Sequence, residues 1–251
     1  RDVAPSRGLG DVYKRQMDTE YEAGVEMGKF FADKGIKTAA IYGTFIPNPM
    51  HVYRTAGVLA GLGLSYGGAT TEEDVVGLIF ADQGIDLSKI SGDIKIVSYL
   101  QGYGDTTTDE INAAIQAAPE AFISVGMATT FFTQQLNAAG IEFSDIDSFT
   151  KSNGEAITNG KLVYLAGKYS SSVGPAFALV MNAINGNVIR DAQGNAVSLS
   201  QNYQVATDSE TFDKFYKNDN GDNPIYSRDT LDQIIGDTVT FDTINEVVAS
   251  N

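Results

Sequence analysis

Apolar and polar residues along the chain form segments of two kinds, short apolar runs and longer amphipathic stretches. The apolar runs predict buried strands at 38–43, 94–100, 121–125, 145–149 and 162–166. The amphipathic stretches predict helices at 20–34, 52–62, 107–118 and 130–139, with a capping pattern that starts another helix at 71–74. Strands that alternate with helices at this spacing indicate an α/β fold, a parallel sheet flanked by helices on both faces.

The pattern changes after Ser172. It predicts a helix, a hairpin, a strand and then short helices, at 173–184, 187–199, 203–206, 210–216, 229–235 and 241–248. The turn of the hairpin is expected at 191–195, where the sequence reads Asp-Ala-Gln-Gly-Asn. No long linker, internal repeat or low-complexity run separates these segments.

The first residues point to a separate origin. The stretch SRGLGDVYKRQ resembles the in-frame translation of a transposase adapter used in DNA library preparation, whose codons GAT-GTG-TAT-AAG-AGA-CAG read Asp-Val-Tyr-Lys-Arg-Gln. We therefore expect residues 1–16 to be a non-native leader and exclude them from the fold prediction. The same interpretation predicts that a natural N-terminal portion is missing. The alternative is an ordinary flexible polar leader.

Charge and composition narrow the functional classes. With 17 Lys and Arg against 32 Asp and Glu, the surface repels phosphate backbones, so we expect no nucleic-acid partner. The chain has no cysteine, which excludes disulfides, thiolate catalysis and cysteine–zinc sites. It has no run of about 18 apolar residues, so no direct membrane span is expected. An acidic chain without cysteine fits an exported bacterial protein, although many cytosolic proteins share this profile.

Motifs for catalysis and cofactors are missing from the sequence. The segment 154–161 is spaced wrongly for a phosphate loop and lacks the Ser or Thr that would follow its lysine. His51 is the sole histidine, which rules out a histidine-rich metal site, and no Gly-x-Ser-x-Gly elbow occurs. The acidic turn at 218–222 lacks the distal glutamate of a calcium loop. We therefore expect no enzyme, no metal and no cofactor.

Four groups of segments, in order along the chain, resemble one known family. They are 21–28, then 41–43 with 51–57, then 121–128 with 135–141, and finally 157–162 with 169–174 and 185–186. Together they span most of residues 20–187. In order and spacing they resemble the type I periplasmic binding proteins, the ribose- and galactose-binders of ABC importers.

The resemblance implies a division of the chain. Residues 17–168 would form the second ligand-binding lobe, and 169–206 would be a crossover segment belonging to a first lobe that is mostly missing together with its export signal. Residues 207–251 would form a C-terminal helical tail. Because the crossover segment has little to complete, we expect an apolar face of the helix at 173–184 to be partly exposed, as a consequence of truncation.

The family binds its ligands at the carboxyl ends of the strands, as open α/β sheets do. Arg54 matches the arginine with which the family donates a fork of hydrogen bonds to ligand hydroxyls. The alternative is a surface arginine at a helix start. Tyr103 lies where the family places a ring that stacks against a sugar face, or it only covers the core.

Several positions depart from the family pattern. Met127 follows Gly126 where the family has Asn-Asp, and it offers an adaptable apolar surface. Ser148, or Asp147 if the alignment slips by one, takes the place of an acidic residue, and Lys168 replaces a glutamine. These changes favour a ligand that is less hydroxylated or negatively charged. His51 lies in the same rim and could donate to the ligand, or it is a plain surface histidine.

The resemblance predicts an extracytoplasmic solute-binding protein, periplasmic or lipid-anchored at the cell surface. It would capture a small molecule, a sugar or a sugar-like compound, between two lobes and deliver it to the ABC permease. One alternative is the ligand-binding effector domain of a LacI-type transcription regulator, which shares this fold. Another is a nucleoside-binding lipoprotein of the same fold, which 45–47 (Phe-Ile-Pro) favours.

Overall fold

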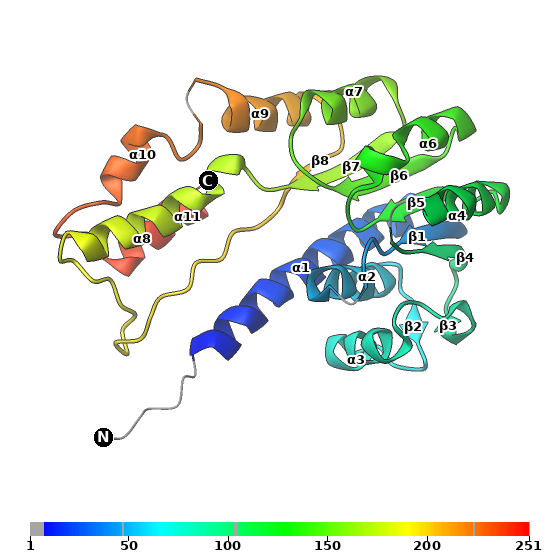
Figure 1. The fold of residues 1–251 in the computed structure, drawn as a ribbon, viewed down its shortest axis with the longest axis horizontal. Coiled ribbons are helices and arrows are strands. Elements are labelled where there is room, and N and C mark those ends of the chain that lie inside the picture. Colours follow the sequence, from blue (N-terminus) through cyan, green and yellow to red (C-terminus); the bar gives the residue numbers. More distant parts are fainter. Residues whose placement is uncertain (1–7, 47, 103–104, 223, 251) are drawn as a thin grey trace.

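The structure is a computed structural model that describes residues 8–46, 48–102, 105–222 and 224–250 (Figure 1). Its helices are α1 (Gly8–Asp33), α2 (Pro49–Gly61), α3 (Glu72–Asp82), α4 (Asp105–Gln116), α5 (Ala128–Phe131), α6 (Thr133–Ala139), α7 (Lys151–Asn159), α8 (Gly174–Ile184), α9 (Ser209–Asn220), α10 (Arg228–Gln233) and α11 (Phe241–Ala249), with short 3-10 turns η1 (Leu87–Lys89) and η2 (Ser170–Val173). Its strands are β1 (Thr38–Tyr42), β2 (Ser65–Tyr66), β3 (Ile90–Ser91), β4 (Lys95–Leu100), β5 (Ala121–Ser124), β6 (Glu142–Ile146), β7 (Leu162–Gly167) and β8 (Gln204–Ala206).

The main sheet has the strand order β4-β1-β5-β6-β7-β8 in the described part of the chain. The first five of these strands run parallel, and β8 pairs antiparallel with β7. The chain moves from β1 outward to β4, then returns past β1 to β5 and continues in the opposite direction. The predicted α/β class with a mostly parallel sheet is confirmed, and the order reverses between β1 and β5.

Strand residues alternate between two core layers, one on each face of the sheet. In β1, Ala39 and Ile41 contact the layer formed with α1, α2 and α3. The neighbouring Ala40 and Tyr42 point the other way, into the layer that includes residues of α4, α6, α7 and α9. Because both faces are covered, β1 is apolar at nearly every position rather than at every second one.

Helices α1 and α2 cross at unusually close range, through glycines on both helices. A Cβ placed on Gly57 would lie 2.1 Å from the carbonyl oxygen of Tyr21, and one on Gly24 would lie 2.1 Å from that of Arg54. Gly28 and Gly61 repeat this contact one turn further along. The two backbones therefore touch from Arg54 to the last residue of α2, Gly61.

A third apolar cluster lies apart from the two sheet layers. It joins α8, α10 and α11 through the buried residues Ala178, Ile234 and Ile244, and Figure 1 shows these helices grouped beyond one side of the sheet. The opposite face of α8 is exposed to solvent: Phe177 is 48% exposed and Ile184 71%. The expected exposed apolar face is thus confirmed, whereas its cause, a missing lobe, stays a prediction.

The predicted division at 168/169 and 206/207 also stays a prediction. The structure shows one relevant contact: β8 hydrogen-bonds to β7, so residues 204–206 add a strand to the main sheet. Helix α9 packs against the same sheet, with Phe212 and Phe215 in the second core layer. No helix in the described part of the chain combines the length and apolar character needed to span a lipid bilayer.

Two predicted elements were wrong in their limits. The strand expected at 145–149 is β6, three residues earlier, because its buried middle positions are the polar Ser144 and Asp145. The helix expected at 130–139 is split into α5 and α6 at Phe132, whose φ of −126° and ψ of −2° lie outside the helical region. Gly140 ends α6 in a left-handed conformation, which is common for a glycine that follows a helix.

Other differences follow from polar sequences. Helix α7 was missed because its sequence is polar and contains Gly154, whose missing side chain leaves room for the ring of Phe212. The short strands β2 and β3 were also missed. The hairpin at 187–199 is reduced to one antiparallel bridge, between Arg190 and Ala196. Helix α1 begins at Gly8, upstream of the expected start at Glu20.

Candidate functional site

The loops at the reversal between β1 and β5 are tied to each other by hydrogen bonds. The Thr44 hydroxyl donates to the Gly126 carbonyl at 2.6 Å, and the Gly102 amide donates to the Thr44 carbonyl at 2.5 Å. The Tyr42 hydroxyl donates to the Gly102 carbonyl at 2.8 Å. The loops after β1, β4 and β5 therefore form one fixed rim at the carboxyl ends of the strands, where open α/β sheets bind ligands.

Two rim residues have strained backbones. Thr44 and Met127 have φ of 57° and 70°, the left-handed region that non-glycine residues seldom adopt. Such strain costs about 1–3 kcal/mol per residue and concentrates at binding sites. Met127, which the sequence predicted as a ligand contact, is 37% exposed, and Phe45 on the loop after β1 is exposed as well.

Arg54 is buried under this rim. Its side chain leaves α2 and donates from Nε to Glu20 at 2.6 Å and from Nη1 to the Val125 carbonyl at 2.9 Å. Its Nη2 donates to the Tyr203 hydroxyl at 2.6 Å. Three of the five guanidinium N–H groups are thus bonded within the protein, and only 6% of the side chain is exposed. A ligand could reach Arg54 only if the groups that cover it moved.

Glu20 and Tyr203 complete the cluster, although neither was predicted from the sequence. Glu20, on α1, is 2% exposed and accepts from the Tyr203 hydroxyl at 2.8 Å. Tyr203 lies just before β8, and its ring contacts the Arg54 guanidinium and the Lys168 ammonium, the latter 4.4 Å from the ring centroid. Segments far apart in the sequence therefore meet over one buried ion pair.

The remaining predicted residues have different environments. His51 is buried rather than at the surface, and its Nδ1 accepts from the Phe45 amide at 3.1 Å. Burial lowers the pKa of this imidazole, so it is neutral at pH 7. Ser148 is exposed after β6, and Lys168 is half-buried after β7. Tyr103 lies outside the described residues.

A second polar cluster is built around Asp145, which is fully buried in β6. Its carboxylate accepts from Ser124 Oγ at 2.9 Å and from both the amide and the hydroxyl of Thr129, at 2.7 and 2.8 Å. The Thr129 hydroxyl also reaches Asp147 at 2.7 Å. Burial raises the pKa of Asp145 to about 6 despite these hydrogen bonds, and the charge of Asp147 adds to the increase. The cluster fixes the loop that carries Met127.

This pKa gives a testable dependence of stability on pH. Between about pH 6 and pH 4 the folded chain takes up a proton at Asp145 that the unfolded chain does not, so acidification stabilises the folded state. Relative to Asp145→Asn, the wild type should gain about 2 kcal/mol in free energy of unfolding between pH of about 7.5 and 4.5. Urea denaturation at both values measures this difference.

The matched variant is Asp147→Asn, which leaves the buried carboxyl in place. It should keep most of the wild-type pH dependence, because Asp147 is only a secondary cause of the raised pKa. An equal pH dependence in the wild type and Asp145→Asn would show that Asp145 does not titrate in this range.

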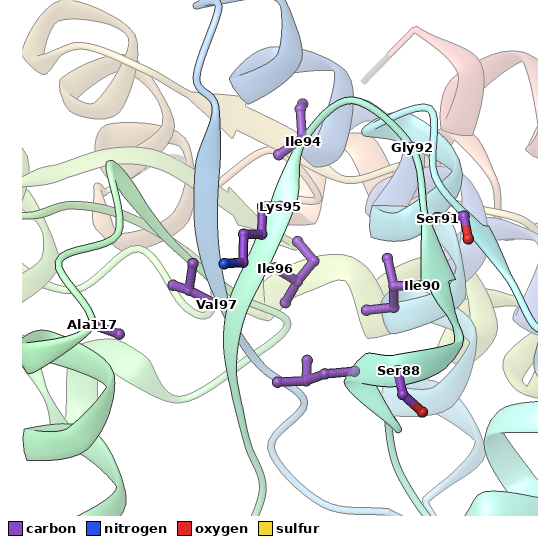
Figure 2. Close-up of a pocket in the computed structure, with 10 residues that line it drawn as sticks. Ser88, Ile90, Ser91, Gly92, Ile94, Lys95, Ile96, Val97 and Ala117 are labelled. Carbon is purple, nitrogen blue, oxygen red and sulfur yellow. The ribbon is translucent and has the colours of Figure 1, made fainter.

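Two larger cavities flank the sheet. One, of about 710 Å³, lies beside the edge strand β4 and is lined mainly by aliphatic side chains such as Ile90, Ile94 and Ile96 (Figure 2). The other, of about 530 Å³, lies next to Lys168 where the chain leaves and re-enters the sheet. The first contains none of the predicted site residues, whereas the second contains one. Among the described residues, no group of three or more acidic or histidine side chains is placed to hold a metal ion.

Comparisons with known proteins show what this architecture resembles. No known protein-family profile and no curated protein sequence matches the chain. Solved structures do, among them an ABC transporter periplasmic solute-binding protein from Actinobacillus succinogenes 130z with bound D-allose. Its TM-score is 0.53 at 15% identity, covering 78% of this chain and 61% of that one.

Two further structures give the same result. The arabinose-binding periplasmic component of an ABC transporter from Shewanella sp. ANA-3 has a TM-score of 0.52 at 17% identity, covering 80% of this chain and 61% of its own. A sugar-binding protein of a Bacillus halodurans ABC transporter has a TM-score of 0.52 at 13% identity, and the match covers 78% of this chain and 64% of that one. This chain therefore has the fold of periplasmic sugar-binding proteins and spans under two thirds of the length of these three.

Proposed function

We propose that the chain is the solute-binding component of an ABC importer, which captures a small sugar or sugar-like molecule between two lobes and delivers it to the permease. The observation that carries this proposal is the fixed, strained rim at the strand-order reversal, on a fold shared with sugar-binding proteins of ABC transporters. The protein would act outside the cytoplasm. Its work is binding and lobe closure, with no bond made or broken.

The rim has the chemistry that such a ligand needs. Phe45 and Met127 present apolar surface, which suits the C–H face of a sugar, while Ser148 and Lys168 present polar groups for its hydroxyls. We propose Arg54, Tyr103 and His51 as further residues of this wall, Arg54 once the groups that cover it have moved. In a two-lobed binding protein the facing wall would come from the first lobe.

The first test is solute binding by the chain itself. At saturating concentration, a bound monosaccharide should raise the melting temperature by several degrees, because a ligand at about 100 times its Kd stabilises by about 2.7 kcal/mol. D-Allose and L-arabinose are the first probes, followed by a panel of neutral sugars and sugar acids. Isothermal titration calorimetry then gives Kd. If no solute in the panel binds, the proposed function is wrong.

A pair of variants locates the binding surface. Met127→Ala should weaken binding severalfold, because it removes apolar contact from the rim while the backbone stays as it is. The matched variant Leu87→Ala removes a side chain of similar exposure, 39% against 37%, from the cavity beside β4. It should leave Kd unchanged. If Leu87→Ala weakened binding and Met127→Ala did not, the ligand would bind in the cavity beside β4 and not at the rim.

A further inference from the structure

The cavity of about 530 Å³ lies between the two stretches that connect the sheet to α8. One wall is the stretch leaving β7, with Lys168 and Ser172, and the other is the stretch returning to β8, with Gln201 and Asn202. Gln201 joins the walls, because its Nε2 donates to the Ser172 carbonyl at 2.9 Å. Helix α11 closes one side through Asn245. The volume is in the range of small-molecule sites.

The side chains that line this cavity carry mostly hydroxyl and amide groups. Ser172, Ser200, Gln201 and Asn245 can both donate and accept hydrogen bonds, which suits a ligand with several hydroxyls. Aromatic and aliphatic residues, including Phe241, supply apolar surface next to them. The lining is therefore that of a polyhydroxylated ligand rather than of an apolar one.

The lining of this cavity differs in charge from the rest of the molecule. Lys168 is the one charged residue among the described residues that line it. Its ammonium lies 3.9 Å from Glu20 Oε1, but the carboxylate of Glu20 is already bonded to Arg54 and Tyr203. Two cations thus share one anion, which leaves one positive charge at the wall of the cavity in a chain whose formal net charge is −15.

The pKa of Lys168 also indicates that nearby negative charge does not fully balance its positive charge. Burial lowers the pKa of its ammonium, Glu20 partly offsets this, and the charge of Arg54 lowers the pKa further. An anion placed in the cavity would restore balance. Arginine, the residue suited to bidentate phosphate binding, does not occur among the described lining residues, whereas one lysine suits a single negative charge.

We propose that this cavity binds the carboxylate of a small polyhydroxylated acid, a sugar acid, with Lys168 as the carboxylate partner and Gln201, Asn202 and Asn245 as hydroxyl partners. This inference rests on the proposed function and adds to it the charge of the solute. Lys168 also ends β7 at the rim, so the ligand would reach from the connecting stretches towards the rim.

The test compares each acid with its uncharged parent sugar on the full chain. Titration calorimetry with D-galacturonate and D-galactose, and with D-gluconate and D-glucose, is expected to give at least about tenfold tighter binding for one of the acids, an advantage that decreases with salt. In Lys168→Met the acid should lose far more affinity than its neutral parent sugar, so the advantage of the acid should disappear.

Two further variants keep the outcomes distinct. Lys214→Met removes an exposed lysine of α9 and should leave both affinities unchanged. Asn245→Ala should weaken binding of the acid, because Asn245 lines this cavity. If neutral sugars bind as tightly as their acids, the inference is overturned and the proposed function stands. If the chain binds the acid more tightly than the neutral sugar but neither cavity variant weakens this binding, the assignment of the site to this cavity is wrong. If nothing binds, the proposed function fails as well.

Discussion

Gly57→Ala is expected to destabilise the folded chain by about 3 kcal/mol or more, the upper end of the cost of overpacking. The new Cβ would lie 2.1 Å from the Tyr21 carbonyl oxygen and 2.9 Å from the Val25 amide nitrogen, both backbone atoms that cannot rotate away. Helices α1 and α2 would have to separate. Because Glu20 and Arg54 lie on these helices, the buried ion pair would be stretched too. Urea denaturation followed by circular dichroism measures the loss.

The matched variant is Gly77→Ala in the middle of α3. No atom lies within 4 Å of a Cβ placed there, so alanine adds helix propensity without a clash. A gain of about 0.5–1 kcal/mol is expected. If Gly57→Ala proved as stable as the wild type, the close approach of α1 and α2 would be wrong. A loss at Gly77 as large as the loss at Gly57 would mean that the clash with α1 is not what destabilises Gly57→Ala.

The sheet could be predicted from the sequence where both faces of a strand are apolar. Residues 38–42 and 121–124 are buried at nearly every position, and short apolar runs of this kind are typical of strands covered on both faces. Strand β6 shows the limit, because Ser144 and Asp145 are buried there by hydrogen bonds with groups that become neighbours only after folding. A pattern of apolar residues carries no information about such partners.

The candidate site shows the same limit at longer range. The sequence placed Arg54 in the helix after the first strand and Lys168 directly after a later strand, as the structure has them, since the limits of elements follow from periodicity and turn residues. It did not indicate Glu20 or Tyr203, which are 183 positions apart and meet only through the crossing of α1 with α2 and the return of the chain to β8. Whether Arg54, Tyr103 or Met127 binds a ligand stays a prediction.

The second large effect is expected for Arg54→Met, which should cost about 3–5 kcal/mol in free energy of unfolding. Methionine fills much of the volume but leaves the Glu20 carboxylate, 2% exposed, without the cation that hydrogen-bonds to it. It also leaves the Val125 carbonyl and the Tyr203 hydroxyl without a donor. Lys168, at 3.9 Å, is too distant to replace a hydrogen bond of 2.6 Å.

The double variant Glu20→Gln with Arg54→Met separates charge from packing. Glutamine removes the uncompensated charge, so the double variant should be more stable than Arg54→Met alone, by about 1–3 kcal/mol. If the double variant lost the sum of the two single costs, the two side chains would be acting independently, and the contact at 2.6 Å would not describe the folded protein.

An exposed ion pair in the same protein provides the reference. Lys34 and Glu142 bond to each other with side chains 36% and 40% exposed, so Lys34→Met should cost less than about 1 kcal/mol. The two pairs have the same kind of charges but differ in access to water, which screens the partner left behind. A cost for Arg54→Met as small as that for Lys34→Met would therefore mean that water reaches Glu20, and that Tyr203 does not close over the cluster.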